Sequence, residues 1–149
     1  MLARLNTHRA WANHVYLDWL AALTTPDDYC LKMLSHVLRA EEAWLTRLRG
    51  GTPENRVWDV SSREELEALR VLNDAALETF VNEEPQALAR VLRYTSFDGT
   101  PMESTVADIL SHVCLHGVHH RAQIAAHATR AGLPKPPSRD FIVFAREHP

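Results

Sequence analysis

Apolar residues recur every three or four positions in four long segments of the chain, which is the spacing expected for one face of an α-helix. The first segment covers residues 2–23 and ends at a Thr-Thr-Pro sequence, and the second covers about residues 31–48 and ends at two glycines. The third is opened by Ser62 and Glu65, which have the spacing of a capping box, and it stops before Pro85. These segments predict three amphipathic helices.

The fourth helical segment follows a short stretch with a different pattern. Residues 94–102 alternate polar and apolar side chains around an Asp-Gly turn signal, which predicts a short hairpin. Thr105 and Asp108 then mark a helix start, and helical spacing continues to about Ala131, before Gly132 ends the helix. The sequence therefore predicts an all-α fold: an antiparallel four-helix bundle with a hairpin-like segment before the last long helix. We expect the C-terminal tail to dock on the bundle.

Length and composition place these helices in one globular domain, residues 1–149. Apolar residues make up 46% of the chain and charged residues 23%, which is enough apolar material for a core. The formal net charge of −3 argues against nucleic acid as a partner, and no apolar run reaches the roughly 18 residues of a membrane span. The N-terminus lacks a secretory signal pattern, and the two cysteines form no disulfide framework. We therefore expect a cytoplasmic protein with no membrane partner.

Histidine is concentrated in the last predicted helix. His116 and His120 are four residues apart, so they share one helix face. On a helix that advances about 100° per residue, both lie at the edge of the apolar stripe, whereas His112 and His119 point away from it. Histidine is the commonest metal ligand, so the pair at the edge of the core predicts part of a divalent metal site.

A tight metal site needs a third ligand from a facing helix, and His36 is the best candidate. It lies beside apolar positions in the second predicted helix, where an unpaired buried imidazole would cost free energy. Three imidazoles with a fourth coordination position open are typical of catalytic rather than structural sites. The competing interpretation is that the histidines are hydrogen-bonded structural residues, which would make the protein a helical interaction module.

Other polar residues predict no further chemistry. Glu41 and Glu42 are candidate acceptors for an imidazole N–H, but a solvated helix face is the simpler interpretation. Arg121 lies on a different side of its helix from the histidine pair, so we assign it no role. Cys114 is interpreted as a packed thiol. The remaining histidines are interpreted as structural or surface residues: His8, His14, His112, His119, His127 and His148.

Four motifs, in the order known from one protein family, carry a resemblance that covers nearly the whole chain. Residues 116–123, His-Gly-Val-His-His-Arg-Ala-Gln, resemble the His-x-x-x-His-Arg-Gly-Gln signature of the DinB/YfiT-like family. Residues 34–45 are similar to the second-helix motif of that family, residues 9–13 to its N-terminal signature and residues 132–137 to its closing one. One departure is Ala122, where glycine is usual, and we expect it to matter little to the metal ligands.

The resemblance implies a DinB-type four-helix bundle, often dimeric, that holds one divalent metal on three histidines. By motif match these are His36, His116 and His120. Characterised relatives include metal-dependent transferases and isomerases that use low-molecular-weight thiols such as bacillithiol or mycothiol. The resemblance therefore implies a homodimeric thiol S-transferase or isomerase whose partners are a small-molecule thiol and an electrophile. The alternative is a non-catalytic metal-binding or stress-response dimer module. Imidazole suits zinc, nickel, iron and manganese alike, so all four metals remain candidates.

Overall fold

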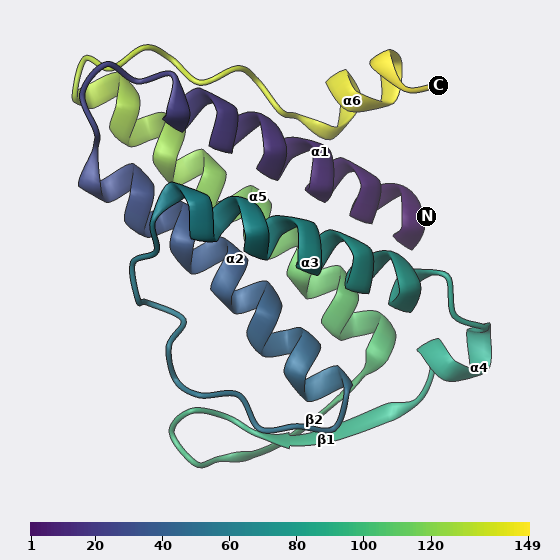
Figure 1. The fold of residues 1–149 in the computed structure, drawn as a ribbon. Helices are drawn as coiled ribbons and strands as arrows, with labels where there is room; N and C mark the ends of the chain where they lie inside the picture. Colours follow the sequence, from purple (N-terminus) through teal and green to yellow (C-terminus); the bar gives the residue numbers. More distant parts are fainter.

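The computed structural model describes residues 1–149, and most of them are helical. In chain order the elements are α1 (Leu2–Ala21), α2 (Asp28–Leu48), α3 (Arg63–Val81), α4 (Pro85–Leu88), β1 (Val91–Thr95), β2 (Pro101–Thr105), α5 (Val106–Arg130) and α6 (Phe141–Glu147). The four long helices are α1, α2, α3 and α5, and the hairpin lies across one end of them (Figure 1). The predicted helical class and the hairpin before the last long helix are confirmed. None of the helices has the length and apolar character that crossing a membrane requires.

Side chains at the helix N-termini determine where three of the long helices begin. Ser62 and Glu65 form the predicted capping box of α3, and Thr105 caps α5 as predicted. Asp27 caps α2 by accepting a hydrogen bond from the backbone N–H of Cys30 at 2.8 Å. This cap starts α2 three residues before the predicted position, because the apolar period from which the start was predicted begins only at Leu31.

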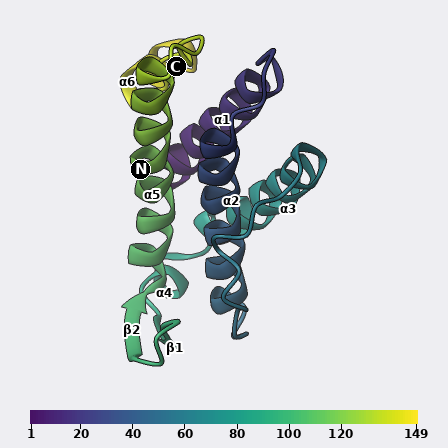
Figure 2. The same ribbon diagram turned by 90° about the vertical axis from the view of Figure 1, so that its left-hand side faces the viewer.

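The segment of residues 49–62 carries the chain back along the helices before α3 begins, so α2 and α3 run in the same direction (Figure 1). Helices α1 and α5 run together in the opposite direction. Figure 2 shows α2 and α5 side by side, and this antiparallel pair has the most extensive contact of the helical core. Residues of α2 therefore lie opposite the histidine-rich part of α5.

Two apolar clusters form the core, one toward each end of the long helices. The first includes Leu34, Leu38, Leu66 and Ile124, and the second includes Leu48, Leu77, Leu110 and Val113. Each cluster draws side chains from several helices, so burial of apolar surface holds the helices together. Cys114 is buried, as predicted for a packed thiol.

A layer of buried polar side chains separates the two apolar clusters. Arg9 Nη1 lies 3.0 Å from Glu41 Oε2, and Asn13 Nδ2 donates to Glu41 Oε1 at 2.9 Å. Arg121 Nη1 donates to Asn13 Oδ1 at 2.6 Å. The predicted solvated position of Glu41 is therefore wrong, because this carboxylate is 1% exposed and accepts bonds from α1. Arg121, to which the sequence assigned no role, belongs to the same layer.

The hairpin covers the C-terminal end of α2. Strands β1 and β2 pair in antiparallel register, with Tyr94 opposite Met102, and β2 continues directly into α5. The ring of Tyr94 packs edge-on against Trp44 of α2, with the ring centres 5.2 Å apart. The hairpin thus supplies a wall beside the last turns of α2.

The C-terminal tail docks on α1, as predicted. Phe144 of α6 is 2% exposed, and its ring lies 5.5 Å from those of His8 and Trp11. His8 is also bonded to the carbonyl of Arg139 at 2.7 Å, so it is a structural histidine. The sequence pattern does not predict α4 or α6 as helices, because four and seven residues are too few to show a helical period.

Gly117 lies between the two histidines of α5, and the side chain of Arg121 fills the space beside it. A Cβ atom at this position would lie 2.7 Å from Arg121 Nη1, which is held in place by Asn13. We expect Gly117→Ala to lower the free energy of unfolding by about 1–3 kcal/mol, although alanine favours helix, as measured by urea denaturation. Val118→Ala, on the exposed side of the same turn, should change it by no more than about 0.5 kcal/mol. Equal stability of the two variants would contradict this packing.

Candidate metal centre

The Nε2 atoms of His36, His116 and His120 converge between α2 and α5. His116 Nε2 lies 3.2 Å from His36 Nε2 and 3.1 Å from His120 Nε2. Three imidazole nitrogens bound tetrahedrally to one zinc-sized ion at about 2.0–2.1 Å would lie roughly 3.3 Å from one another. The structure therefore brings together the three residues that the sequence selected, at a spacing that suits one divalent ion.

The packing of α2 against α5 creates this convergence. His116 and His120 are one turn apart on α5, and the antiparallel α2 places His36 across from them. His36 and His120 are 6% and 8% exposed, whereas His116 is partly open to solvent. The group is thus rigidly mounted on two helices and still accessible from one side.

Hydrogen bonds on the far side of two of the rings fix their orientation. His36 Nδ1 bonds to the carbonyl oxygen of Val57 at 2.8 Å, and His120 Nδ1 to the side-chain oxygen of Gln123 at 2.7 Å. A carbonyl oxygen only accepts, so both Nδ1 atoms carry the proton and both Nε2 atoms present lone pairs to the centre. Three nitrogens this close with at most one proton among them are an electron-rich donor set, which is what a cation needs. The residues fit a metal ion.

Burial keeps these imidazoles neutral. Desolvation, with the neighbouring imidazoles as a smaller cause, lowers the pKa of His116 to about 3. Desolvation also lowers the pKa values of His36 and His120 below the ordinary histidine value. Neutral imidazole is the form that binds metal, so at neutral pH none of the three side chains has to lose a positive charge before an ion binds.

The segment between α2 and α3 contributes two groups that the sequence did not reveal. Trp58 stacks on the ring of His36, with the ring centres 3.6 Å apart and the planes within 9° of parallel. The indole is 50% exposed, so one face covers the imidazole and the other meets solvent. Val57, next to it, provides the carbonyl acceptor described above. The acceptor is therefore a loop carbonyl and not Glu41 or Glu42.

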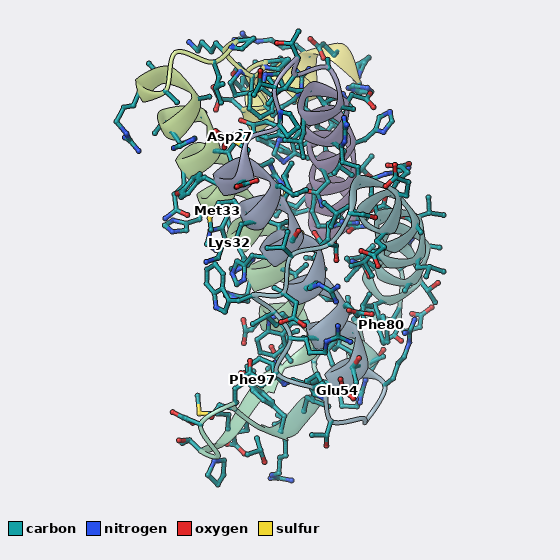
Figure 3. All side chains as sticks on the ribbon, turned by 60° about the vertical axis from the view of Figure 1, so that its left-hand side comes forward. Asp27, Lys32, Met33, Glu54, Phe80 and Phe97 are labelled. Carbon is teal, nitrogen blue, oxygen red and sulfur yellow. The ribbon has the colours of Figure 1, made fainter.

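A mostly apolar cavity of about 290 Å³ opens beside His36. Its lining comes from one face of α2, from the hairpin and from Val57, and consists of His36, Ala40, Ala43, Trp44, Arg47, Val57, Tyr94, Ser96, Phe97 and Met102. Figure 3 shows Phe97 of the hairpin beside the lower part of α2. The cavity is large enough for a small organic molecule that touches His36.

A second group of possible ligands, Asp27, Cys30 and His127, lies at the other end of α2. His127 Nε2 is 3.1 Å from Asp27 Oδ2, and the Tyr29 ring stacks on the imidazole. Desolvation and the adjacent Asp27 raise the pKa of Cys30 to about 12, so this sulfur is a thiol at neutral pH. The group is therefore a helix cap with an attached histidine, consistent with the structural role predicted for His127.

The lowered pKa of His116 predicts how the metal-free protein responds to acid. Below about pH 6.5 His116 binds a proton in the unfolded chain, whereas in the folded chain it does so only near pH 3. The free energy of unfolding should therefore decrease as the pH falls through that window. We expect this decrease to be smaller in His116→Gln, measured as the urea midpoint at neutral pH and at about pH 5 with chelator present. The control His14→Gln changes an exposed histidine of α1 and leaves His116 in place, so the loss of stability that His116 causes should remain. Identical pH dependence in His116→Gln and wild type would contradict the assignment.

The comparison with known families agrees with this geometry. A family model described as the DinB family matches residues 2–147, nearly the whole chain. No curated protein matches the sequence.

Proposed function

The chain belongs to the DinB family, and from that premise we propose that it is a metal-dependent transferase that joins a low-molecular-weight thiol to a small electrophile. The observation that carries the proposal is the convergence of three neutral imidazole nitrogens next to an organic-sized cavity. Purely structural metal sites are usually closed by four protein ligands, whereas this group offers three. A divalent ion held there would supply Lewis acidity and lower the pKa of a bound thiol.

The residues around the centre have definite tasks in this proposal. Val57 and Gln123 hold the rings of His36 and His120 by their Nδ1 protons, which keeps both Nε2 atoms directed inward. Trp58 shields His36 from water on one face. The apolar cavity binds the body of the electrophile beside His36, so that the two reactants meet at the open side of the histidine group.

One observation favours the second candidate, a non-catalytic metal-binding or stress-response dimer module, in its lack of catalysis. No aspartate or glutamate hydrogen-bonds to any of the three imidazoles, so the centre lacks an adjacent carboxylate to accept a proton. A transferase can do without one, because the thiol proton can leave to water. A non-catalytic module would need none at all.

Elemental analysis followed by a thiol-transfer assay separates the two candidates. The purified protein is loaded in turn with zinc, nickel, iron and manganese and is assayed with a panel of small thiols and electrophiles. Thiol-dependent turnover that chelator abolishes and metal restores is the result expected for the transferase. Stoichiometric metal without turnover for any pair would favour the non-catalytic module, and protein that binds none of the four metals would overturn both.

A further inference from the structure

Arg47 is a buried cation without a counter-ion. It is 6% exposed, and its Nε is buried with no hydrogen-bond partner. The guanidinium carbon lies 4.6–5.3 Å from the ring centres of Trp44, Tyr94 and Phe97. Two other arginines are as deeply buried, and both have polar side-chain partners: Arg9 pairs with two carboxylates, and Arg121 donates to Asn13. The three rings attract the guanidinium through their faces, but none of them carries a net negative charge, so the positive charge of Arg47 has no anion within the fold.

Arg47 lines the same cavity as His36, one of the three converging histidines. The two side chains are eleven residues apart on α2, which is about 16 Å along the axis and within about 20° of the same face. Between them that face carries only Ala40 and Ala43, and their small side chains leave room for the cavity. The Arg47 guanidinium lies over the ring of Trp44, three residues nearer to His36 along the helix, as expected because long helical side chains lean toward the helix N-terminus.

We propose that Arg47 binds the carboxylate of the molecule that reacts at the histidine centre, which makes the substrate class small carboxylic acids with an apolar body. This inference rests on the proposed function, since it places the acid between Arg47 and the metal ligands. The carboxylate belongs either to the electrophile or to the thiol, and in both cases the same fork of N–H donors receives it.

The side chains that line the cavity suit a small carboxylic acid. A guanidinium matches the two oxygens of a planar carboxylate, and a single positive charge balances a monoanion better than a phosphate dianion. The two hydroxyls of the lining, those of Tyr94 and Ser96, already have partners within the hairpin, Ser104 and Asp98, so Arg47 is the group of the lining that is left to bind an anion. The remaining walls are mainly aromatic and aliphatic, which suits a hydrocarbon body and gives no partner to further polar groups.

Calorimetric binding of phenylacetate and phenylacetamide tests the inference. These probes have nearly the same shape and differ in charge, and chelated protein is used first so that the carboxylate cannot bind a metal. We expect wild-type protein to bind the acid roughly 10- to 100-fold more tightly than the amide. Arg47→Met should bring the two affinities within about twofold while the affinity for the amide is retained, which also shows that the cavity is still folded. Arg47→Lys, which keeps the charge without the fork, should retain part of the preference.

Arg93→Met is the matched control, because it removes the same charge from an exposed arginine of the hairpin that pairs with Glu103. It should keep the wild-type preference. Equal affinities in the wild type, no binding of phenylacetate, or a preference that survives Arg47→Met would each overturn the inference.

A second pair of probes, N-acetylcysteine and its amide with zinc-loaded protein, distinguishes the source of the carboxylate. A preference in this pair that depends on Arg47 assigns the carboxylate to the thiol, and a preference confined to the phenyl pair assigns it to the electrophile. Carboxylate recognition without thiol transfer would leave this subsite standing and overturn the proposed function. Thiol transfer without carboxylate recognition would support the proposed function and overturn the carboxylate subsite.

Discussion

His120→Ala is expected to lose most of its bound metal while its helices remain folded. The remaining imidazoles, His36 and His116, would leave an ion with two protein ligands, and few sites of that kind hold metal through dialysis. Replacing a group that merely orients a ligand costs 10- to 100-fold in metal affinity, so loss of the ligand itself should cost at least about 100-fold. The metal content measured by elemental analysis after dialysis should therefore fall from near one equivalent per chain to below about a tenth of an equivalent.

His119→Ala is the matched control for this experiment. His119 directly precedes His120 on the same helix, but its imidazole is exposed and is not among the three converging side chains. It should keep its metal, and circular dichroism should show the same helix content in both variants. Full metal occupancy in His120→Ala, or equal loss in both variants, would show that the three nitrogens do not bind one ion.

The helices and hairpin could be predicted because their signals are local. Ser62 and Thr105 mark helix starts by bonds to residues three positions away, and the Asp-Gly turn at Gly99 marks the hairpin. The direction of α3 is not a local property. It depends on where the long segment after α2 runs, and that path is held by contacts such as the bond from Arg39 Nε to the carbonyl of Asp59. The apolar period is the same for parallel and antiparallel neighbours.

The same distinction between local and long-range contacts separates the residues of the candidate metal centre that could be predicted from those that could not. His116 and His120 could be found because four-residue spacing on one helix fixes their proximity, and His36 could be selected because an imidazole among apolar residues needs a partner. Trp58 and the carbonyl of Val57 come from an irregular segment, where no periodicity indicates which way a side chain or carbonyl points. A lone loop tryptophan was the only available signal for that part of the centre.

The interpretation of Glu41 as part of a solvated helix face was wrong, because it took charge as a sign of exposure. Glu41 and Glu42 are adjacent and chemically alike, yet one is enclosed and the other lies at the surface. The difference arises from Arg9 and Asn13 of α1, which reach Glu41 across the core. A charged residue is buried when its partner is buried with it, and the sequence does not show which distant residues will pair.

Glu41→Ala is therefore expected to be the most destabilising single change, because it leaves Arg9 without its fully buried partner and removes the negative charge that offsets Arg121. Breaking a buried pair by removing one member costs about 3–5 kcal/mol, a large part of the 5–15 kcal/mol typical of a domain. Urea denaturation should show this loss, with a smaller one in Glu41→Gln, which retains an oxygen for Arg9 and Asn13. Glu42→Ala, one residue away, should stay within about 0.5 kcal/mol of wild type. If both alanine variants lost the same stability, the buried layer would not be what holds α1 against α2 and α5.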